Sequence, residues 1–325
     1  LMSIYGEEKL YNDGLNIYTT IDMDHQRLMT QSLQQGLIKI DKRQGTFYPI
    51  YQVSEANKLQ VKELLQKIND ENLLTLPHGY RLALVEKIHP SDAIYIYLGE
   101  TLGKIPWSKA SWAHNSPKIN DVVLVKESDE NFSLEQEPKV EGGMLSMEPA
   151  SGYITAMNGG YSFDRSEFNR ITKACRQPGS LFKPIVYSAA IALKQYTPAT
   201  LIQDAPLTFY NGQDGIWKPK NLSDTYKGEV TVREALMNSM NVPTINVMAD
   251  VGAKNVLDWA KNLGISTPLK VELGTAIGSS CVTPYEIGQV YSVIANLGAK
   301  IDPILIKEVQ DRDHNRINFR ADRND

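Results

Sequence analysis

A hydroxyl and an amine stand three residues apart in the segment Arg176-Gln-Pro-Gly-Ser180-Leu-Phe-Lys183-Pro184. Residues three apart on a helix lie on one face, with Cβ atoms about 5–6 Å apart. Proline is tolerated only in the first turn of a helix, so Pro184 predicts that the helix begins near Ser180. The pair Pro178-Gly179 predicts a turn before it, which aims backbone N–H groups at an anion. The spacing therefore predicts a serine nucleophile with Lys183 as its base.

This motif alone is weak, because serine is an ordinary N-cap and a chain of this length holds about one SxxK by chance. It is, however, the only SxxK here, and Ser239-Met240-Asn241 is the only SxN. We expect a helix over 230–240, opened by a Thr231 and Glu234 capping box and stopped before Pro243. Ser239 can then relay a proton and Asn241 can hold a peptide amide. The alternative is a polar helix end with Asn241 as its cap.

A lysine base must be neutral, yet an unperturbed lysine has a pKa of about 10.4 and is about 0.04% neutral at pH 7. We therefore expect burial to depress the pKa of Lys183. Two cysteines, Cys175 and Cys281, have no metal-ligand spacing around them, and the five histidines have no companions. No metal site and no cofactor are expected, and Cys175 is predicted to be a buried, inert thiol.

Composition indicates folded domains and excludes nucleic-acid binding. The chain has 42% apolar residues, 22% charged residues and a net charge of −4, with no basic excess. No stretch approaches the ~18–20 apolar residues of a membrane helix. Any anchor is therefore expected to lie outside this sequence.

The hydrophobic pattern divides the chain into three parts. Residues 1–40 predict a linker strand (15–22) and a helix after Asp22 or Asp24. Residues 41–140 predict a helix over 58–68 and a small barrel, with strands over 80–88, 93–98 and 121–125. Residues 141–325 predict two strands joined by a turn at 149–152, followed by helices over 180–194, 230–240, 254–263 and 284–296.

SxxK followed by SxN is the signature of the penicillin-recognising serine acyltransferases. The wider sequence resembles the class A penicillin-binding proteins of the 1A type. The segments that carry this resemblance follow the family's order: 142–160, Asn169-Arg170 with RQPGSLFKP, Trp217-Lys-Pro-Lys-Asn221, 228–235, Gly278-Ser279 with Thr283-Pro284, and Ala295-Asn-Leu-Gly298. Leu15 to Asp22 resembles the segment that in this family joins the glycosyltransferase domain to the transpeptidase domain.

The resemblance implies an α+β penicillin-binding transpeptidase fold, an antiparallel sheet with helices on both faces, plus a small OB-like domain at 41–140. It implies that Ser180, Lys183 and Ser239 are catalytic and that Asn241 and Trp217 bind substrate, although Trp217 is equally expected in the core. The family's third motif, Lys-Ser/Thr-Gly, occurs nowhere in the chain. We therefore interpret the sequence as the C-terminally incomplete transpeptidase portion of a protein whose glycosyltransferase domain and membrane helix lie outside it.

The implied function is a serine D-Ala-D-Ala transpeptidase that crosslinks peptidoglycan stem peptides and is acylated by β-lactams. The implied location is the periplasmic or extracytoplasmic side of a bacterial inner membrane, anchored by an N-terminal helix outside this chain. The OB-like domain is a candidate dock for an accessory cell-wall protein. Three alternatives stay open: a non-catalytic scaffold or sensor, a β-lactamase-like hydrolase, and a binding module built on the middle domain.

Overall fold

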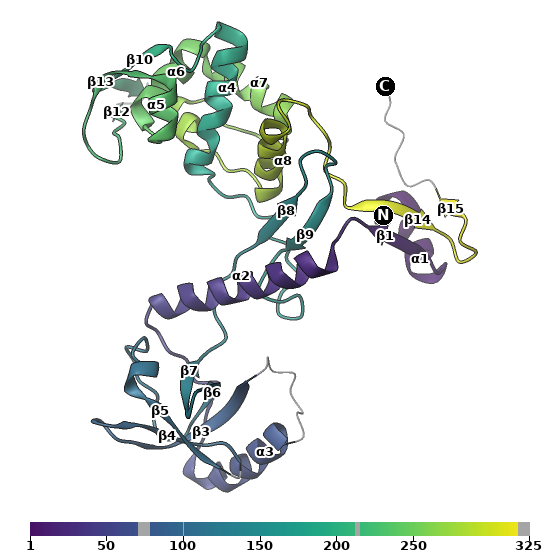
Figure 1. Ribbon diagram of the computed structural model, residues 1–325, viewed down its shortest axis with the longest axis vertical. Coiled ribbons are helices and arrows are strands. Elements are labelled where there is room, and N and C mark those ends of the chain that lie inside the picture. Colours follow the sequence, from purple (N-terminus) through teal and green to yellow (C-terminus); the bar gives the residue numbers. More distant parts are fainter. Residues whose placement is uncertain (71–78, 100, 212–214, 318–325) are drawn as a thin grey trace. The chain divides into compact units, whose positions relative to one another are not determined.

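Two compact units make up the chain. The computed structural model describes residues 1–70, 79–99, 101–211 and 215–317 (Figure 1). Unit 1 comprises Leu1–Thr30 with Gly143–Asp325, and unit 2 comprises Gln31–Gly142. Helix α2 (Met23–Arg43) passes from one to the other. The first thirty residues cluster with the C-terminal region, where the sequence suggested a separate linker part. The three-part division stays a prediction.

Unit 2 is an antiparallel sheet that curls on itself. Its strands follow the order β2-β6-β3-β4-β5, and β7 also pairs with β6. Strands β5 and β7 lie in contact, and a Cβ at Gly103 would lie 2.7 Å from the Phe132 ring. This closes the sheet into a small barrel. The elements are β2 (Tyr51–Gln52), α3 (Lys58–Asp70), β3 (Tyr80–Ile88), β4 (Ala93–Tyr97), β5 (Leu102–Pro106), β6 (Asp121–Ser128) and β7 (Asn131–Glu135).

Strand β3 is buried on both faces because each face meets a different apolar cluster. Successive side chains of a strand point to opposite faces. Ala83 and Val85 therefore enter the barrel interior, while Leu82 and Leu84 pack with Leu65 of α3. Helix α3 thus covers the outside of the barrel.

Unit 1 contains short antiparallel strand pairs. Strands β8 (Met144–Met147) and β9 (Ile154–Asn158) form the predicted hairpin, with Gly152 at φ +75° in its turn. The predicted N-terminal strand is β1 (Asn16–Thr19), whose partner is β14 (Ile306–Gln310). The other elements are α1 (Met2–Asn12), β10 (Leu201–Asp204), which pairs with β13 (Gly228–Thr231), β11 (Phe209–Asn211), which pairs with β12 (Gly215–Trp217), and β15 (Arg316–Ile317), which pairs with β14.

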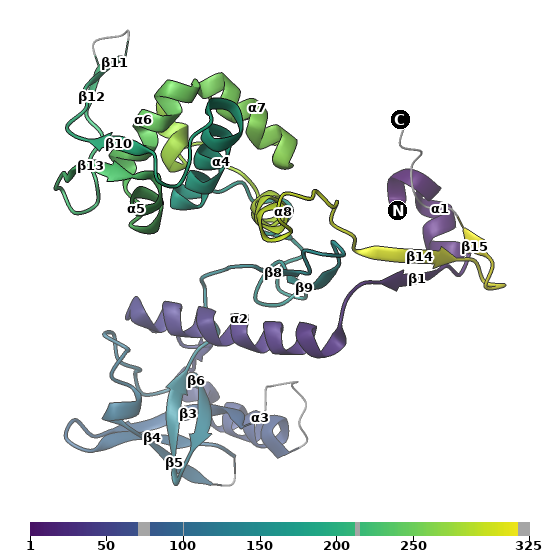
Figure 2. The same ribbon diagram turned by 45° about the horizontal axis from the view of Figure 1, so that its top comes forward.

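A helical core holds most of the buried side chains of unit 1. Helix α4 contacts α5, α6 and α7, as Figures 1 and 2 show. Fully buried side chains from α4 and α6, such as Ile185, Val186 and Ile245, form its centre. The elements are η3 (Gly179–Phe182), α4 (Lys183–Lys194), α5 (Val232–Met237), α6 (Asn241–Val251), α7 (Ala253–Leu263), η4 (Leu273–Ile277) and α8 (Pro284–Ala295).

The helix predicted over 230–240 was partly wrong. Helix α5 ends at Met237, and a second helix, α6, begins at Asn241 with Pro243 in its first turn. Proline disrupts a helix where its missing N–H would have donated to a carbonyl one turn earlier, and residues in the first turn have no such carbonyl within the helix. Thr231 caps α5 as predicted by accepting from the Glu234 N–H, but the Glu234 carboxylate bonds Lys227 and does not close the capping box.

The prediction of a buried thiol at Cys175 was wrong, because Cys175 and Cys281 form a disulfide. Their Cα atoms lie 5.3 Å apart although 106 residues separate them in sequence. Residue spacing gives no sign of such a contact. None of the helices in the described ranges is long and apolar enough to cross a lipid bilayer.

Candidate active site

Ser180 lies in the exposed turn that leads into α4. Gly179 has φ +56°, and nothing lies within 4 Å of the place where its Cβ would be. Two residues on, Phe182 is fully buried and anchors the turn in the helical core. Ser180 is the second residue of the short helix η3 (Gly179–Phe182), so its backbone N–H belongs to the first turn and has no partner within the helix. The serine is thus presented to solvent on a fixed backbone.

Lys183, the first residue of α4, is buried, with 1% of its surface exposed. Its ammonium donates to the Ser239 carbonyl at 2.5 Å, to Ser239 Oγ at 3.1 Å and to Asn241 Oδ1 at 2.7 Å. These three acceptors match the three donors of an ammonium group. The structure therefore brings three of the predicted site residues, Lys183, Ser239 and Asn241, into one hydrogen-bonded group.

Burial lowers the pKa of Lys183 to about 8. Desolvation disfavours the charged form of a lysine, and here no carboxylate among its hydrogen-bond partners restores it. At this pKa about a tenth of the lysine is neutral at pH 7. Its environment has the character that the sequence analysis required of a base.

The predicted contact between Ser180 and Lys183 is not a hydrogen bond in this structure. Within the described ranges, no hydrogen bond joins the Lys183 ammonium to Ser180 Oγ. The reason is that the ammonium faces the turn between α5 and α6, where its three acceptors lie. The two residues are one turn apart, a separation that side chains bridge readily on a helix.

The turn that supplies these acceptors is set by backbone geometry. Ser239 has φ +51°, and its N–H donates to the Leu236 carbonyl at 3.0 Å, which closes the end of α5. Left-handed backbone is uncommon for a residue other than glycine. Here it turns both the carbonyl and the hydroxyl of Ser239 toward Lys183. Tyr187, one turn after Lys183, bonds Thr244 at 2.9 Å and holds α4 against α6.

The start of α6 is capped from a distant segment. Asn221 Oδ1 accepts from the backbone N–H groups of Asn241 and Val242 at 2.9 and 3.1 Å. Asn221 Nδ2 in turn donates to Asp204 Oδ1 at 2.7 Å, and Asp204 is fully buried. The Asn241 side chain donates to the Lys220 carbonyl at 2.9 Å. Asn241 is thereby fixed through both its backbone and its carboxamide.

Trp217 opens the segment that ends at Asn221. Its ring centroid lies 5.6 Å from that of Phe209, and it is half-buried against the helical core. Among the described residues, it makes no hydrogen bond to Lys183, Ser239 or Asn241. Neither Asn221 nor Asp204 was predicted to belong to the site, since the only sequence signal was the membership of Asn221 in the motif WxPxN.

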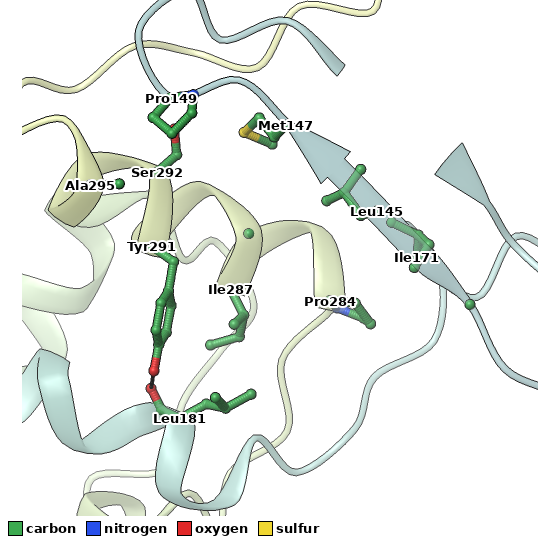
Figure 3. Close-up of a pocket in the computed structure, with 12 residues that line it drawn as sticks. Leu145, Met147, Pro149, Ile171, Leu181, Pro284, Ile287, Tyr291, Ser292 and Ala295 are labelled. Atoms are coloured by element: carbon green, nitrogen blue, oxygen red, sulfur yellow. Dashed lines mark hydrogen bonds between the residues drawn. The ribbon is translucent and has the colours of Figure 1, made fainter. Parts of the chain in front are cut away.

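A groove of about 590 Å³ lies next to the serine turn (Figure 3). Leu145 and Met147 of β8 line one side, and Ile287 and Tyr291 of α8 line the other. Leu181, the residue after Ser180, lines it as well, and its carbonyl accepts from the Tyr291 hydroxyl at 3.2 Å. The serine turn therefore contacts α8 directly.

Residues 142–323 match the family model of the penicillin binding protein transpeptidase domain. This span contains Ser180, Lys183, Ser239 and Asn241, together with the segments that hold them. The chain belongs to this transpeptidase family. The antiparallel strands and clustered helices of unit 1 are accordingly a penicillin-binding transpeptidase fold.

Relatives of the family match nearly the whole chain. Penicillin-binding protein 1A of Rickettsia conorii is 33% identical over 325 residues, which cover 98% of this chain and 40% of the relative. The Pseudomonas aeruginosa protein of the same name is 31% identical, covering 95% of this chain and 39% of the relative. The chain thus spans about 40% of the length of these relatives.

A solved structure shows the same fold. Penicillin-binding protein 1A from Haemophilus influenzae superposes with a TM-score of 0.83 at 25% identity, over 98% of this chain and 48% of that one. PonA1 from Mycobacterium tuberculosis superposes with a TM-score of 0.58 at 16% identity, which supports the fold alone. The fold predicted from the sequence is therefore confirmed as that of a class A transpeptidase portion.

Proposed function

We propose that this chain is the acyl-transfer portion of a serine D-Ala-D-Ala transpeptidase. The observation that carries the proposal is Lys183, a buried lysine one turn after an exposed serine, held by Ser239 and Asn241. Burying an amine so that its pKa falls toward 7 costs free energy. Groups with such perturbed pKa values are concentrated at sites where proton transfer is needed. The family membership supports the same chemistry.

In the proposed first step, Ser180 Oγ attacks the carbonyl of the penultimate D-Ala of a stem peptide. The hydroxyl proton passes to neutral Lys183, and the backbone N–H of Ser180 stabilises the oxyanion. When the C–N bond breaks, the proton passes through the Ser239 hydroxyl to the departing D-Ala amine. Ser180 is then an ester, and Lys183 is neutral again.

In the second step an amine of a neighbouring stem peptide attacks this ester. Its surplus proton returns along the same route, and Ser180 regains its hydrogen as the new peptide bond forms. Asn241 has one N–H and one lone pair left over from its contacts with Lys220 and Lys183, and these can orient the donor peptide. Trp217 is proposed as a wall of the peptide site.

The setting of the whole protein is part of the proposal. We infer a bifunctional class A enzyme with a glycosyltransferase domain and an N-terminal membrane anchor, acting on peptidoglycan outside the cytoplasmic membrane. β-Lactams would acylate Ser180, and PonA1 from Mycobacterium tuberculosis has been solved with penicillin V. Unit 2 is proposed as a spacer or as a dock for an accessory cell-wall protein.

Labelling of the full-length protein with a fluorescent penicillin tests the assignment. We expect a stable adduct at Ser180 that is lost in Ser180→Ala and strongly slowed in Lys183→Met and Ser239→Ala. Ser223→Ala is the matched control, because Ser223 is an exposed serine whose hydroxyl, among the described residues, bonds that of Thr225 and no other. The proposal is contradicted if Ser180→Ala is still labelled or if the wild type takes no label.

Two alternatives give different results in the same assay. A non-catalytic scaffold takes no label at all. A β-lactamase-like hydrolase takes the label and loses it quickly, with continuous hydrolysis of a chromogenic cephalosporin. A transpeptidase retains the adduct and forms crosslinked stem peptides when a peptide donor and an amine acceptor are supplied.

A further inference from the structure

The turn that carries Ser180 is held on its N-terminal side by residues 278–279. Gly278, at φ +76°, packs so closely that a Cβ there would lie 2.3 Å from the backbone N and O atoms of Gly179. The Gln177 side chain donates to the Ser279 carbonyl at 3.0 Å. The backbone immediately before the nucleophile therefore lies against a segment about a hundred residues further along the chain.

Further back, the same two segments are joined by backbone pairing and by a covalent bond. Arg176 and Val282 form an antiparallel bridge in which each N–H donates to the other's carbonyl at 2.9 Å. Cys175 and Cys281, one position before each of them, form the disulfide. Gly278 through Val282 thus clamps Cys175 through Gly179, and we call this set of contacts the serine clamp.

The far side of the serine is held from the same stretch of chain. Helix α8 begins two residues after Val282, behind a capping box in which Thr283 and Glu286 bond each other. Tyr291 of α8 then donates its hydroxyl proton to the Leu181 carbonyl at 3.2 Å (Figure 3). A single continuous segment, 278–291, therefore holds the backbone on both sides of Ser180.

We propose that the Cys175–Cys281 disulfide positions the nucleophile, so that reduction of this bond slows acylation of Ser180. Ser180 is exposed, and among the described residues its hydroxyl makes no hydrogen bond, so the contacts of the neighbouring residues set its position. The disulfide is the covalent member of the serine clamp. This inference rests on the proposed function, since it concerns the rate at which Ser180 is acylated.

The chemical step is a thiol–disulfide exchange with a dithiol as the reductant. The dithiol supplies two electrons and two protons, the Cys175–Cys281 bond breaks into two thiols, and the dithiol becomes a disulfide. The noncovalent contacts of the clamp remain, but they join segments 106 residues apart without a covalent tie. Misplacement of a reacting group by about 1 Å can cost about 100-fold in rate, so we expect a loss of roughly 10- to 100-fold.

The test compares acylation rates of the full-length protein with a fluorescent penicillin. Oxidised and dithiothreitol-reduced wild type are measured beside Cys175→Ser/Cys281→Ser, and thiol titration reports the state of the bond. We expect reduced wild type and the double variant to share one low rate, with reoxidation restoring only the wild type. The double variant also controls for other effects of dithiothreitol, because it should not respond to it.

The pH profile separates positioning from general loosening. If the bond only positions Ser180, the rate falls at every pH and the midpoint set by Lys183 stays where it is in the oxidised protein. A midpoint that moves upward shows that Lys183 has become exposed, and this overturns the positioning role. Cys175→Ala/Cys281→Val, which refills the site with apolar groups, replaces the serine variant if that variant does not fold by circular dichroism.

The two failures are distinguishable. If oxidised wild type takes no more label than Ser180→Ala, the proposed function is refuted. A reduced wild type with two titratable thiols that is labelled within twofold of the oxidised rate removes the positioning role and leaves the function intact.

Discussion

The pH dependence of acylation follows from the burial of Lys183. Its pKa of about 8 lies below the ordinary value of 10.5, so the neutral fraction at pH 7 is raised about 300-fold. In the proposed mechanism Lys183 must be neutral to act as the base, so the acylation rate should rise with pH. The neutral fraction grows from about 1% at pH 6 to about 90% at pH 9. We expect the acylation rate to rise nearly tenfold per pH unit up to about pH 7, more slowly above it, and to level off above pH 9.

Asn241→Asp is the perturbation that tests the cause. Asn241 Oδ1 lies 2.7 Å from the Lys183 ammonium, so the variant places a negative charge beside it with little change in shape. An opposite charge at such a distance typically raises a lysine pKa by about 1–3 units. The midpoint should move from about pH 8 to about pH 9 or above, and the rate at pH 7 should fall at least tenfold.

Stopped-flow acylation by a β-lactam between pH 6 and 10 measures both quantities. Loss of a binding role of Asn241 lowers the plateau of the acylation rate at alkaline pH, whereas its effect on the pKa of Lys183 moves the midpoint of the pH profile. The two effects are therefore measured separately. Ser223→Ala should reproduce the wild-type curve. A wild-type rate that is flat across this range, or an Asn241→Asp midpoint equal to that of the wild type, would refute Lys183 as the base.

Three further outcomes are expected. Burial by itself raises the pKa of Glu286, but hydrogen-bond donors of Thr283, Ser266 and Thr267 outweigh it and lower the pKa to about 2. The ionised group should therefore add up to about 3 kcal/mol to the free energy of unfolding, and this stability is lost as pH falls from about 4.5 to 2. Urea unfolding should show Glu286→Gln less stable than wild type at neutral pH, with the difference vanishing at low pH. Asn221→Ala should lower the unfolding free energy by about 1–2 kcal/mol and slow acylation, because the start of α6 loses its cap; an acylation rate equal to wild type would contradict that role. Removing the disulfide should lower the unfolding free energy by about 2–4 kcal/mol, measured in urea with and without reductant.

Local chemistry made much of the fold predictable. A short apolar run bounded by turn residues located β3, and Thr283 with Pro284 located the start of α8, because strands and helix caps depend on neighbouring residues. Each of these signals lies within a dozen residues of sequence. The resemblance of the SxxK and SxN motifs to the family signature likewise predicted that Lys183 and the Ser239-Met240-Asn241 turn belong to one site.

What could not be predicted depends on long-range packing. The left-handed backbone of Ser239 and the new helix at Asn241 follow from the cap that Asn221 supplies from another segment. The disulfide follows from the pairing of Arg176 with Val282. The direction of the Lys183 side chain, toward Ser239 and away from a bond with Ser180, is also set by a distant turn.

The pairing of β1 with β14 has a consequence for biosynthesis. Tyr18 bonds Gln310, 292 residues later, so β1 cannot pair with β14 until those residues have been synthesised. At about 5–20 residues per second that delay is roughly 15–60 s. Residues 31–142, by contrast, are continuous and contain their own apolar clusters, so they can fold before the partner strand of β1 has been synthesised. During translation, β1 is therefore made long before the strand that it pairs with in unit 1.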